Sequence, residues 1–184
     1  PNLRFAVYGH AEYLQFLKNK DLGFKKDQVL VLRPDPGSTR RSEVVAFRDL
    51  LKQNAALSAV ATASVTPGID ATFKNVVTIE GNEGMKEVGI DIAGADQYFF
   101  DALGIDVVKG KGFTGQLSDT LNAIVVNEAL VKKMGWADPI GKKARVSGGN
   151  DAPFAQVIGV VKDYRQKSLY NPFEPLIFVY RQAG

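Results

Sequence analysis

Few residues of this 184-residue chain have the types and spacing that catalysis or metal binding would need. His10 is the only histidine, so a histidine-based metal site or a Ser/His/Asp relay would have to be built around it. Glu12 lies two residues away, whereas two ligands on one helical face need a spacing of three or four. The chain contains no cysteine, which excludes disulfides, thiolate nucleophiles and zinc–cysteine sites. We therefore expect His10 to have a surface or capping role.

Seven carboxylates lie between residues 80 and 106, namely Glu80, Glu83, Glu87, Asp91, Asp96, Asp101 and Asp106. A glycosidase or a metal site would need two of them to converge in one cleft, which their spacing alone does not establish. Helix capping and turn formation account for Asp96, and exposed strand faces account for most of the others. A hydrolase that uses two of these carboxylates therefore stays open only as an alternative.

Glycines next to lysines suggest a phosphate-binding loop, most clearly in residues 135–143, GWADPIGKK. A Walker A loop has four residues between its glycines and a Ser or Thr after the lysine, whereas this stretch has five residues and then Lys143. Ser64, Thr66 and Ser168 have no neighbouring base, and the sequence has no Gly-x-Ser-x-Gly elbow. The sequence predicts no catalytic residue, no cofactor and no metal site, and so a protein that is not an enzyme.

Three aromatic residues, Tyr164, Tyr170 and Phe173, crowd a stretch between two predicted strands. Aromatic side chains of this size either pack beneath a loop or present a recognition surface. Both interpretations stay open, and these three residues are the candidate partner surface.

The composition is that of an ordinary globular protein, with 45% hydrophobic residues, 23% charged residues and a formal net charge of +3. The basic residues form separated pairs and not one concentrated patch, so nucleic acid is not an expected partner. No apolar run approaches the ~20 residues of a membrane span, and no signal-peptide pattern begins the sequence. Because the chain starts at Pro1, we expect it to be a piece of a longer protein.

Periodicity predicts a mixed α and β protein, with Gly, Pro and Asn at most element boundaries. The polar and apolar spacing of residues 9–20 is that of a surface helix, and a membrane-adjacent helix would show the same spacing. A strand–helix–strand unit is expected next, with a short buried strand at 27–32, a helix from Ser42 to Asn54 and a strand at 57–65.

The second half of the sequence predicts a hairpin and several shorter elements. Strands at 75–81 and 86–94 form the hairpin. Asp96 is the candidate cap of a short helix that Gly104 ends, and residues 114–121 are expected to be a loop. The remaining expected elements are strands at 105–110, 122–126, 155–164 and 175–180, a strand and turn at 142–150, and a helix capped by Asn127 and ended by Gly135.

Five runs, taken in this order and spacing, resemble the periplasmic core domain of MacB/FtsX-type ABC transporter permeases. They are NKDLGFKKDQVLVL (19–32), LLKQNAALSAVATASVTPG (50–68), DQYFFDALGIDVVKGKGF (96–113), IVVNEALVKKMGWADPIGKK (124–143) and VIGVVKDYRQKSLYNPFEPLIF (157–178). One departure is that the family often has Gly-Arg-x-Phe where this chain has residues 110–113, GKGF. The resemblance spans most of the chain and carries no catalytic residue over to it.

The resemblance implies an α+β fold, in which a smaller αβ subdomain is inserted into a porter-like mixed α/β portion. We expect residues 1–96 plus 166–184 to form the porter-like subdomain and residues 97–165 to form the insert. The resemblance also implies a place on the periplasmic or extracytoplasmic side of the inner (cytoplasmic) membrane, between the first two membrane helices of a permease. Residues 9–20 would then be a stalk that leaves the membrane.

The function that the resemblance implies is transmission of conformational change during ATP-driven export of a drug, peptide or lipoprotein. The implied partners are the permease's own membrane helices, a separate cytoplasmic ABC ATPase, a second permease copy and a periplasmic adaptor protein. The alternative is a free-standing periplasmic ligand-binding domain, suggested by the aromatic loop at 164–173 and the hairpin at 75–94. That alternative predicts a deep apolar pocket.

Overall fold

The computed structural model describes residues 22–24, 29–32, 41–65, 73–146, 151–165 and 172–181. Its strands are β1 (Phe73–Glu80), β2 (Met85–Ala95), β3 (Val107–Gly110), β4 (Ala123–Asn127), β5 (Lys143–Arg145), β6 (Ala155–Val161) and β7 (Leu176–Tyr180). Its helices are α2 (Arg41–Lys52), α3 (Phe99–Leu103), α4 (Leu117–Asn122) and α5 (Glu128–Met134). The predicted α+β class is confirmed.

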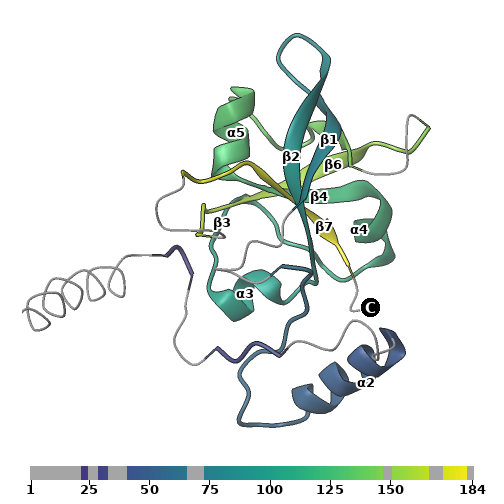
Figure 1. The fold of residues 1–184 in the computed structure, drawn as a ribbon, viewed down its shortest axis with the longest axis vertical. Coiled ribbons are helices and arrows are strands. Elements are labelled where there is room, and N and C mark those ends of the chain that lie inside the picture. Colours follow the sequence, from purple (N-terminus) through teal and green to yellow (C-terminus); the bar gives the residue numbers. More distant parts are fainter. Residues whose placement is uncertain are drawn as a thin grey trace, which may run out of the picture.

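The strands form one sheet in the order β3-β6-β4-β7-β2-β1-β5, and Figure 1 shows how it twists through the centre of the molecule. Strand β5 also pairs with β6, so the sheet closes on itself through this short strand. Most neighbours are antiparallel, whereas β2–β7 and β4–β6 are parallel. The predicted hairpin is confirmed, because β1 pairs with β2 along its whole length, from Phe73 opposite Ile92 to Glu80 opposite Met85.

The alternation of side chains along the central strands divides the apolar residues between two cores. On β4, Val125 points into the first core and Ile124 into the second, and on β7 Phe178 and Ile177 divide in the same way. The aromatic residues of α3 fill the first core. Leu130 and the other buried residues of α5 cover the second.

The predicted ends of two short helices are confirmed. Asn127 caps α5, because its side-chain oxygen accepts a hydrogen bond from the Leu130 N–H at 3.1 Å. Gly135 ends α5 and Gly104 ends α3, at φ 65° and 61°, a left-handed conformation that glycine adopts without steric cost. The predicted cap of α3 is shifted, because Tyr98 occupies the N-cap position and Asp96 accepts from the Tyr98 N–H instead.

The prediction of a loop at 114–121 is wrong, because α4 begins at Leu117. In the turn before this helix, the N–H and hydroxyl of Thr114 and the Gly115 N–H donate hydrogen bonds of 2.6 to 2.9 Å. All three go to one carboxylate oxygen of Asp119, a buried residue within α4. This turn fixes the start of α4. A helix of 6 residues is too short to show an apolar period, so the sequence pattern did not reveal it.

The strands predicted on either side of α2 are also not observed. Residues 29–32 are exposed and pair with no described strand, although a buried strand was expected. In the stretch 57–65, Ala63 alone makes a bridge, to Ala95 of β2. Strand propensity gives a strand only where a neighbour takes up its backbone groups, and residues 29–32 are not placed against any described strand of the sheet.

The two predicted subdomains share this sheet. Strand β4, from the predicted insert at 97–165, pairs with β7 of the predicted porter-like part, and β5 pairs with β1. A division at these boundaries would therefore have to cut through the sheet, and the two-part organisation stays a prediction. Among the helices in the described residues, none is long and apolar enough to cross a membrane.

Candidate functional site

The N-terminal arm, defined here as the described residues between 22 and 65, reaches the sheet at two places. At the first, the Arg165 N–H donates a hydrogen bond to the Leu22 carbonyl at 2.8 Å. The Phe24 ring meets Tyr164 edge-on, with 6.2 Å between the ring centroids. Gly23 lies between these contacts at φ 75°, and a Cβ there would come within 2.5 Å of the Asp163 carbonyl oxygen. The backbone of the arm therefore packs directly on residues 163–165.

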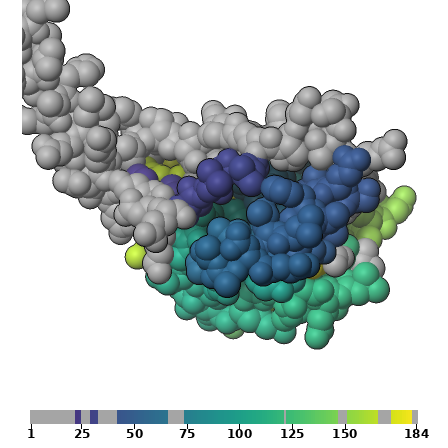
Figure 2. All heavy atoms as spheres, turned by 90° about the horizontal axis from the view of Figure 1, so that it is seen from below, coloured from purple at the N-terminus to yellow at the C-terminus, as the bar shows by residue number. Residues whose placement is uncertain are grey.

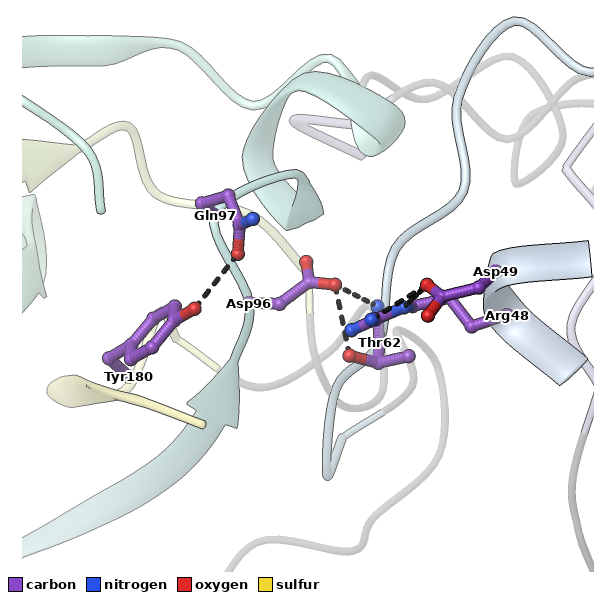
Figure 3. Close-up of polar contacts among 6 residues, drawn as sticks. All are labelled: Arg48, Asp49, Thr62, Asp96, Gln97 and Tyr180. Atoms are coloured by element: carbon purple, nitrogen blue, oxygen red, sulfur yellow. Dashed lines mark hydrogen bonds and ion pairs between the residues drawn. The ribbon is translucent and has the colours of Figure 1, made fainter. Parts of the chain in front are cut away.

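At the second place, Asp96 joins the arm to the end of β2. One oxygen of its carboxylate, Oδ2, accepts hydrogen bonds from the N–H and from the hydroxyl of Thr62, both at 2.9 Å (Figure 3). The other, Oδ1, accepts from the Tyr98 N–H at 3.0 Å. Asp96 is 0% exposed, and a buried carboxylate is tolerated only where donors of this kind satisfy it.

A short antiparallel pairing continues this contact. The Ser64 N–H donates to the Gly94 carbonyl at 2.8 Å, the Ser64 hydroxyl accepts from the Gly94 N–H at 2.7 Å, and Ala63 lies opposite Ala95. The pairing is possible because β1 begins at Phe73, opposite Ile92, which leaves the last residues of β2 without β1 on that edge. We call the contacts of residues 62–64 with residues 94–96 the arm joint.

Helix α2 lies beside the arm joint and contributes two basic residues to its surroundings. The Arg48 side chain is largely buried and pairs with Asp49 at 2.8 Å (Figure 3). The Lys52 ammonium lies 4.0 Å from the centre of the Tyr98 ring, a cation–π contact. Both cations are therefore close to the segment that carries the buried Asp96.

Tyr180, at the end of β7, completes the surroundings of the joint. Its hydroxyl donates to the Gln97 side-chain oxygen at 3.1 Å (Figure 3). Burial raises the pKa of Tyr180 above its usual value, the carboxylates of Asp96 and Asp119 raise it further, and Arg48 lowers it. The Arg181 N–H, one residue on, donates to the Ala95 carbonyl at 3.0 Å. The chain therefore leaves the sheet next to the place where the arm joins it.

Two of the carboxylates between residues 80 and 106, Asp96 and Glu80, have separate partners in the structure. Asp96 is committed to the arm joint, whereas Glu80, at the far end of β1, pairs with Lys142 at 2.9 Å. The hydrogen bond from Lys142 lowers the pKa of Glu80. Within the described residues, no group of three or more His, Cys, Asp or Glu side chains could hold a metal ion. The arm joint is built from hydrogen bonds that hold chain segments together, and we take it as the candidate functional site.

Comparison with known families decides where this fold belongs. The family model described as the MacB-like periplasmic core domain matches residues 7–181. The chain belongs to this family. The resemblance found in the sequence is thereby confirmed, and the arm joint lies within a MacB-like periplasmic core domain.

Two solved structures resemble this MacB-like domain. The periplasmic region of MacB from Actinobacillus actinomycetemcomitans is 19% identical, with a TM-score of 0.49 over 74% of this chain and 54% of that one. The extracellular domain of the noncanonic ABC-type transporter YknZ from Gram-positive bacteria is 18% identical, with a TM-score of 0.49 over 79% of this chain and 64% of that one. The chain thus spans about half to two thirds of the length of these structures. No curated protein matches it.

The aromatic residues predicted as a partner surface are separated in the structure. Tyr164 is only 4% exposed and lies between Phe24 and Phe178, so its ring belongs to the first core and cannot form such a surface. Phe173 is 40% exposed, and the Arg165 guanidinium lies 4.2 Å from its ring centre. A partner surface at Phe173 stays a prediction. Tyr170 and His10 lie outside the described residues.

Sequence reasoning identified Asp96 but not its partner. The prediction placed Asp96 at a helix cap and did not single out Thr62, which lies 34 residues away. On sequence grounds Ser64 is considered only as a possible nucleophile and not as a partner of β2. A local signal existed only for Asp96, as a carboxylate between a strand and a short helix. Nothing in the spacing of a single sequence connects it to the arm.

Proposed function

We propose that this chain is the extracytoplasmic part of an ABC transporter permease in the cytoplasmic membrane, and that it transmits conformational change without catalysing a reaction. The observation that carries the proposal is the match to the MacB-like periplasmic core domain over residues 7–181. The proposed partners are the permease's own membrane helices, a separate cytoplasmic ABC ATPase, a second permease copy and a periplasmic adaptor protein. The proposed cargo is a drug, a peptide or a lipoprotein exported at the expense of ATP.

The first core supports this role, because aromatic contacts run through it from the arm to the end of β7. Phe24 touches Tyr164, and Tyr164 stacks on Phe178 at 6.2 Å. From Phe178 the contacts continue through Phe100 and Phe113 to Tyr180, with centroid separations of 4.9, 6.2 and 5.5 Å. A close-packed core transmits displacement and does not absorb it. A pull on residues 22–24 would therefore move the sheet.

The arm joint supports the role in a different way, because it is a small contact. It consists of one bridged residue pair and the hydrogen bonds of Asp96 and Ser64, whereas the β1–β2 pairing runs the whole length of β1. Contacts of this size can open and close without unfolding the sheet. We propose that the arm joint changes its geometry during the transport cycle while the sheet stays intact.

A disulfide across the joint tests this proposal. Ala63 and Ala95 lie directly opposite each other, and the bonds from Ser64 to Gly94 and from Asp96 to Thr62 flank them. That arrangement is a non-hydrogen-bonded pair, in which Cα atoms lie about 4.5 Å apart, a separation that suits a disulfide. This chain has no cysteine of its own, so Ala63→Cys with Ala95→Cys defines one cross-link.

The expected result is that the full-length transporter carrying this pair loses export when oxidised and regains it when reduced. The matched control is Val76→Cys with Gly89→Cys, an exposed pair that lies directly opposite across β1 and β2. The control transporter should export equally in both redox states. Undiminished export with the Ala63–Ala95 cross-link formed would contradict movement at the joint, although the family assignment would stand.

A further inference from the structure

The arm joint and β1 lie along the same edge of β2. Ala63 lies opposite Ala95, and Phe73, the first residue of β1, lies opposite Ile92. Both pairings are antiparallel, so a continuous strand would need only two residues between Ala63 and the position opposite Ile92. The chain has nine residues there, 64–72, which is seven more than a continuous strand would use.

The seven surplus residues lengthen the connection between the arm and β1. An extended chain covers about 3.3 Å per residue, so seven residues add about 23 Å of reach. Along β2, the arm joint and the start of β1 are only three residues apart, which is about 10 Å of strand. The connection is therefore longer than a contact with the chain's own sheet requires. Such a surplus is what the exchange of an identical element between two copies of a protein needs.

The arm rests lightly on its own sheet. Val65 is the one buried residue among the described residues of the arm, Phe24 is half-buried, and every described side chain of α2 is exposed or half-buried. Figure 2 shows the described arm residues, purple and blue, on the outer face of this end of the molecule. By contrast, Val77 and Ile79 of β1 are 0% exposed and belong to the second core. Separating the arm from the sheet therefore exposes much less apolar area than separating β1 would.

The edge of β2 recognises the arm by side chains as well as by backbone. Thr62 donates both its N–H and its hydroxyl to the Asp96 carboxylate. The Ser64 N–H donates to the Gly94 carbonyl, and the Ser64 hydroxyl accepts from the Gly94 N–H. Because Asp96 is 0% exposed, an occupant without these donors would leave a buried carboxylate oxygen unsatisfied. The edge therefore selects this particular segment of sequence.

A second copy of the chain offers the same segment with the same spacing. We propose that two copies exchange their arms, so that residues 62–64 of each copy pair with residues 94–96 of the other. The exchanged dimer keeps the contacts that the arm makes within one chain, and its cost is the lost freedom of two separate molecules. The dimer should therefore form as the protein concentration rises. This proposal concerns the chain itself and does not rest on a role in transport.

Disulfides between differently tagged chains test the exchange. The chain has no cysteine, so Ala63→Cys in one chain and Ala95→Cys in another place a single thiol on each. The two chains are mixed at high concentration, equilibrated in urea below the unfolding transition, and then oxidised. The 63–95 heterodimer should exceed either homodimer about tenfold, because exchange brings only these two positions to the separation of a disulfide.

The matched control is Val76→Cys in one chain and Gly89→Cys in another. These positions also lie directly opposite each other, but both follow residues 66–72, so arm exchange leaves them within one chain. Their heterodimer should not exceed their homodimers, and equal heterodimer yields from the two mixtures would overturn the proposal.

Sedimentation of the unsubstituted chain makes the result independent of how well the variants fold. The fraction of dimer should rise with protein concentration. A chain that stays monomeric up to its limit of solubility would overturn the proposal. So would a dimer in which the 63–95 heterodisulfide does not form, since the two copies would then meet through another surface.

Discussion

The carboxylate of Asp96 binds both the backbone N–H and the hydroxyl of Thr62 at 2.9 Å, across 34 residues of sequence. This relationship fixes the arm to the sheet at the point where the chain leaves β7. It also explains how a fully buried carboxylate is tolerated, because three donors satisfy its two oxygens.

Removing this carboxylate should destabilise the domain. Asp96→Ala leaves the Thr62 donors and the Tyr98 N–H without their acceptor, which should lower the free energy of unfolding by about 2–3 kcal/mol. Asp96→Asn should lower it less, because its amide keeps one acceptor oxygen. Urea unfolding measures both, with Glu83→Ala in the exposed hairpin loop as a control that should change by less than about 0.5 kcal/mol. Equal losses for Asp96→Ala and Glu83→Ala would contradict the structural role of Asp96.

The close approach of β6 to the segment after β3 requires a glycine at position 159. A Cβ there would lie 2.1 Å from the Lys111 carbonyl oxygen, a backbone atom that cannot turn away. Gly159→Ala should therefore lower the free energy of unfolding by about 2–3 kcal/mol. Gly89→Ala, in β2, adds the same methyl group where no atom lies within 4 Å and should be close to neutral. Similar thermal midpoints for the two variants would show that β3 and β6 are less closely packed than described.

The raised pKa of Tyr180 predicts that the protein loses stability in alkaline solution. Its pKa is raised in the folded protein, chiefly by burial, so the folded state holds the phenol proton more tightly than the unfolded state does. The stabilisation of the folded state by the protonated phenol is therefore fully present below the usual tyrosine pKa of 10.0. It is lost as the pH rises through the pKa of the folded state. The free energy of unfolding should fall more steeply above pH 10 in the wild type than in Tyr180→Phe. Parallel pH profiles for the two proteins would refute this account of Tyr180.

The raised pKa of Asp163 predicts a change of stability with pH in acidic solution. Burial raises its pKa above the usual 3.8, and the neighbouring Glu128 carboxylate adds to the shift. The protonated form is therefore favoured in the folded state, so the stabilising contribution is present below pH 3.8 and is lost as the pH rises through the folded pKa. Asp163→Asn keeps an acceptor for the Asn127 amide and the Ala129 N–H. It should be at least as stable as the wild type at neutral pH, with an advantage that shrinks in acid. The expectation would be contradicted if Asp163→Asn were less stable than the wild type at neutral pH and regained stability relative to the wild type in acid.

The elements predicted best from the sequence were those whose signals are local. Gly135 and Gly104 end helices because of their own backbone freedom, and Asn127 caps α5 through a contact three residues away. The hairpin was predictable because alternating strands and a short turn lie next to each other in the chain. Each of these features is decided within a few residues.

The predictions that failed depend on what lies opposite in space. Residues 29–32 have strong strand propensity, but no described strand pairs with them. The burial of Tyr164 likewise depends on Phe24 and Phe178, which lie far from it in sequence. The arm joint was missed for the same reason, since no spacing connects Thr62 to Asp96. The closed sheet likewise follows from β5 pairing with both β1 and β6, which are far apart in sequence.

A distance measurement in the full-length transporter tests the central claim, movement of the arm against the sheet, most directly. Spin labels at Phe47→Cys on α2 and Met85→Cys on β2 span the arm joint, and both native side chains are exposed. Labels at Leu117→Cys on α4, which packs on β4 and β7, and at Met85→Cys on β2 both lie on the sheet body and serve as the reference pair. We predict that ATP binding shifts the first distance distribution and leaves the second unchanged. An unchanged distance between α2 and β2 through the ATP cycle, in a transporter that exports, would contradict the account.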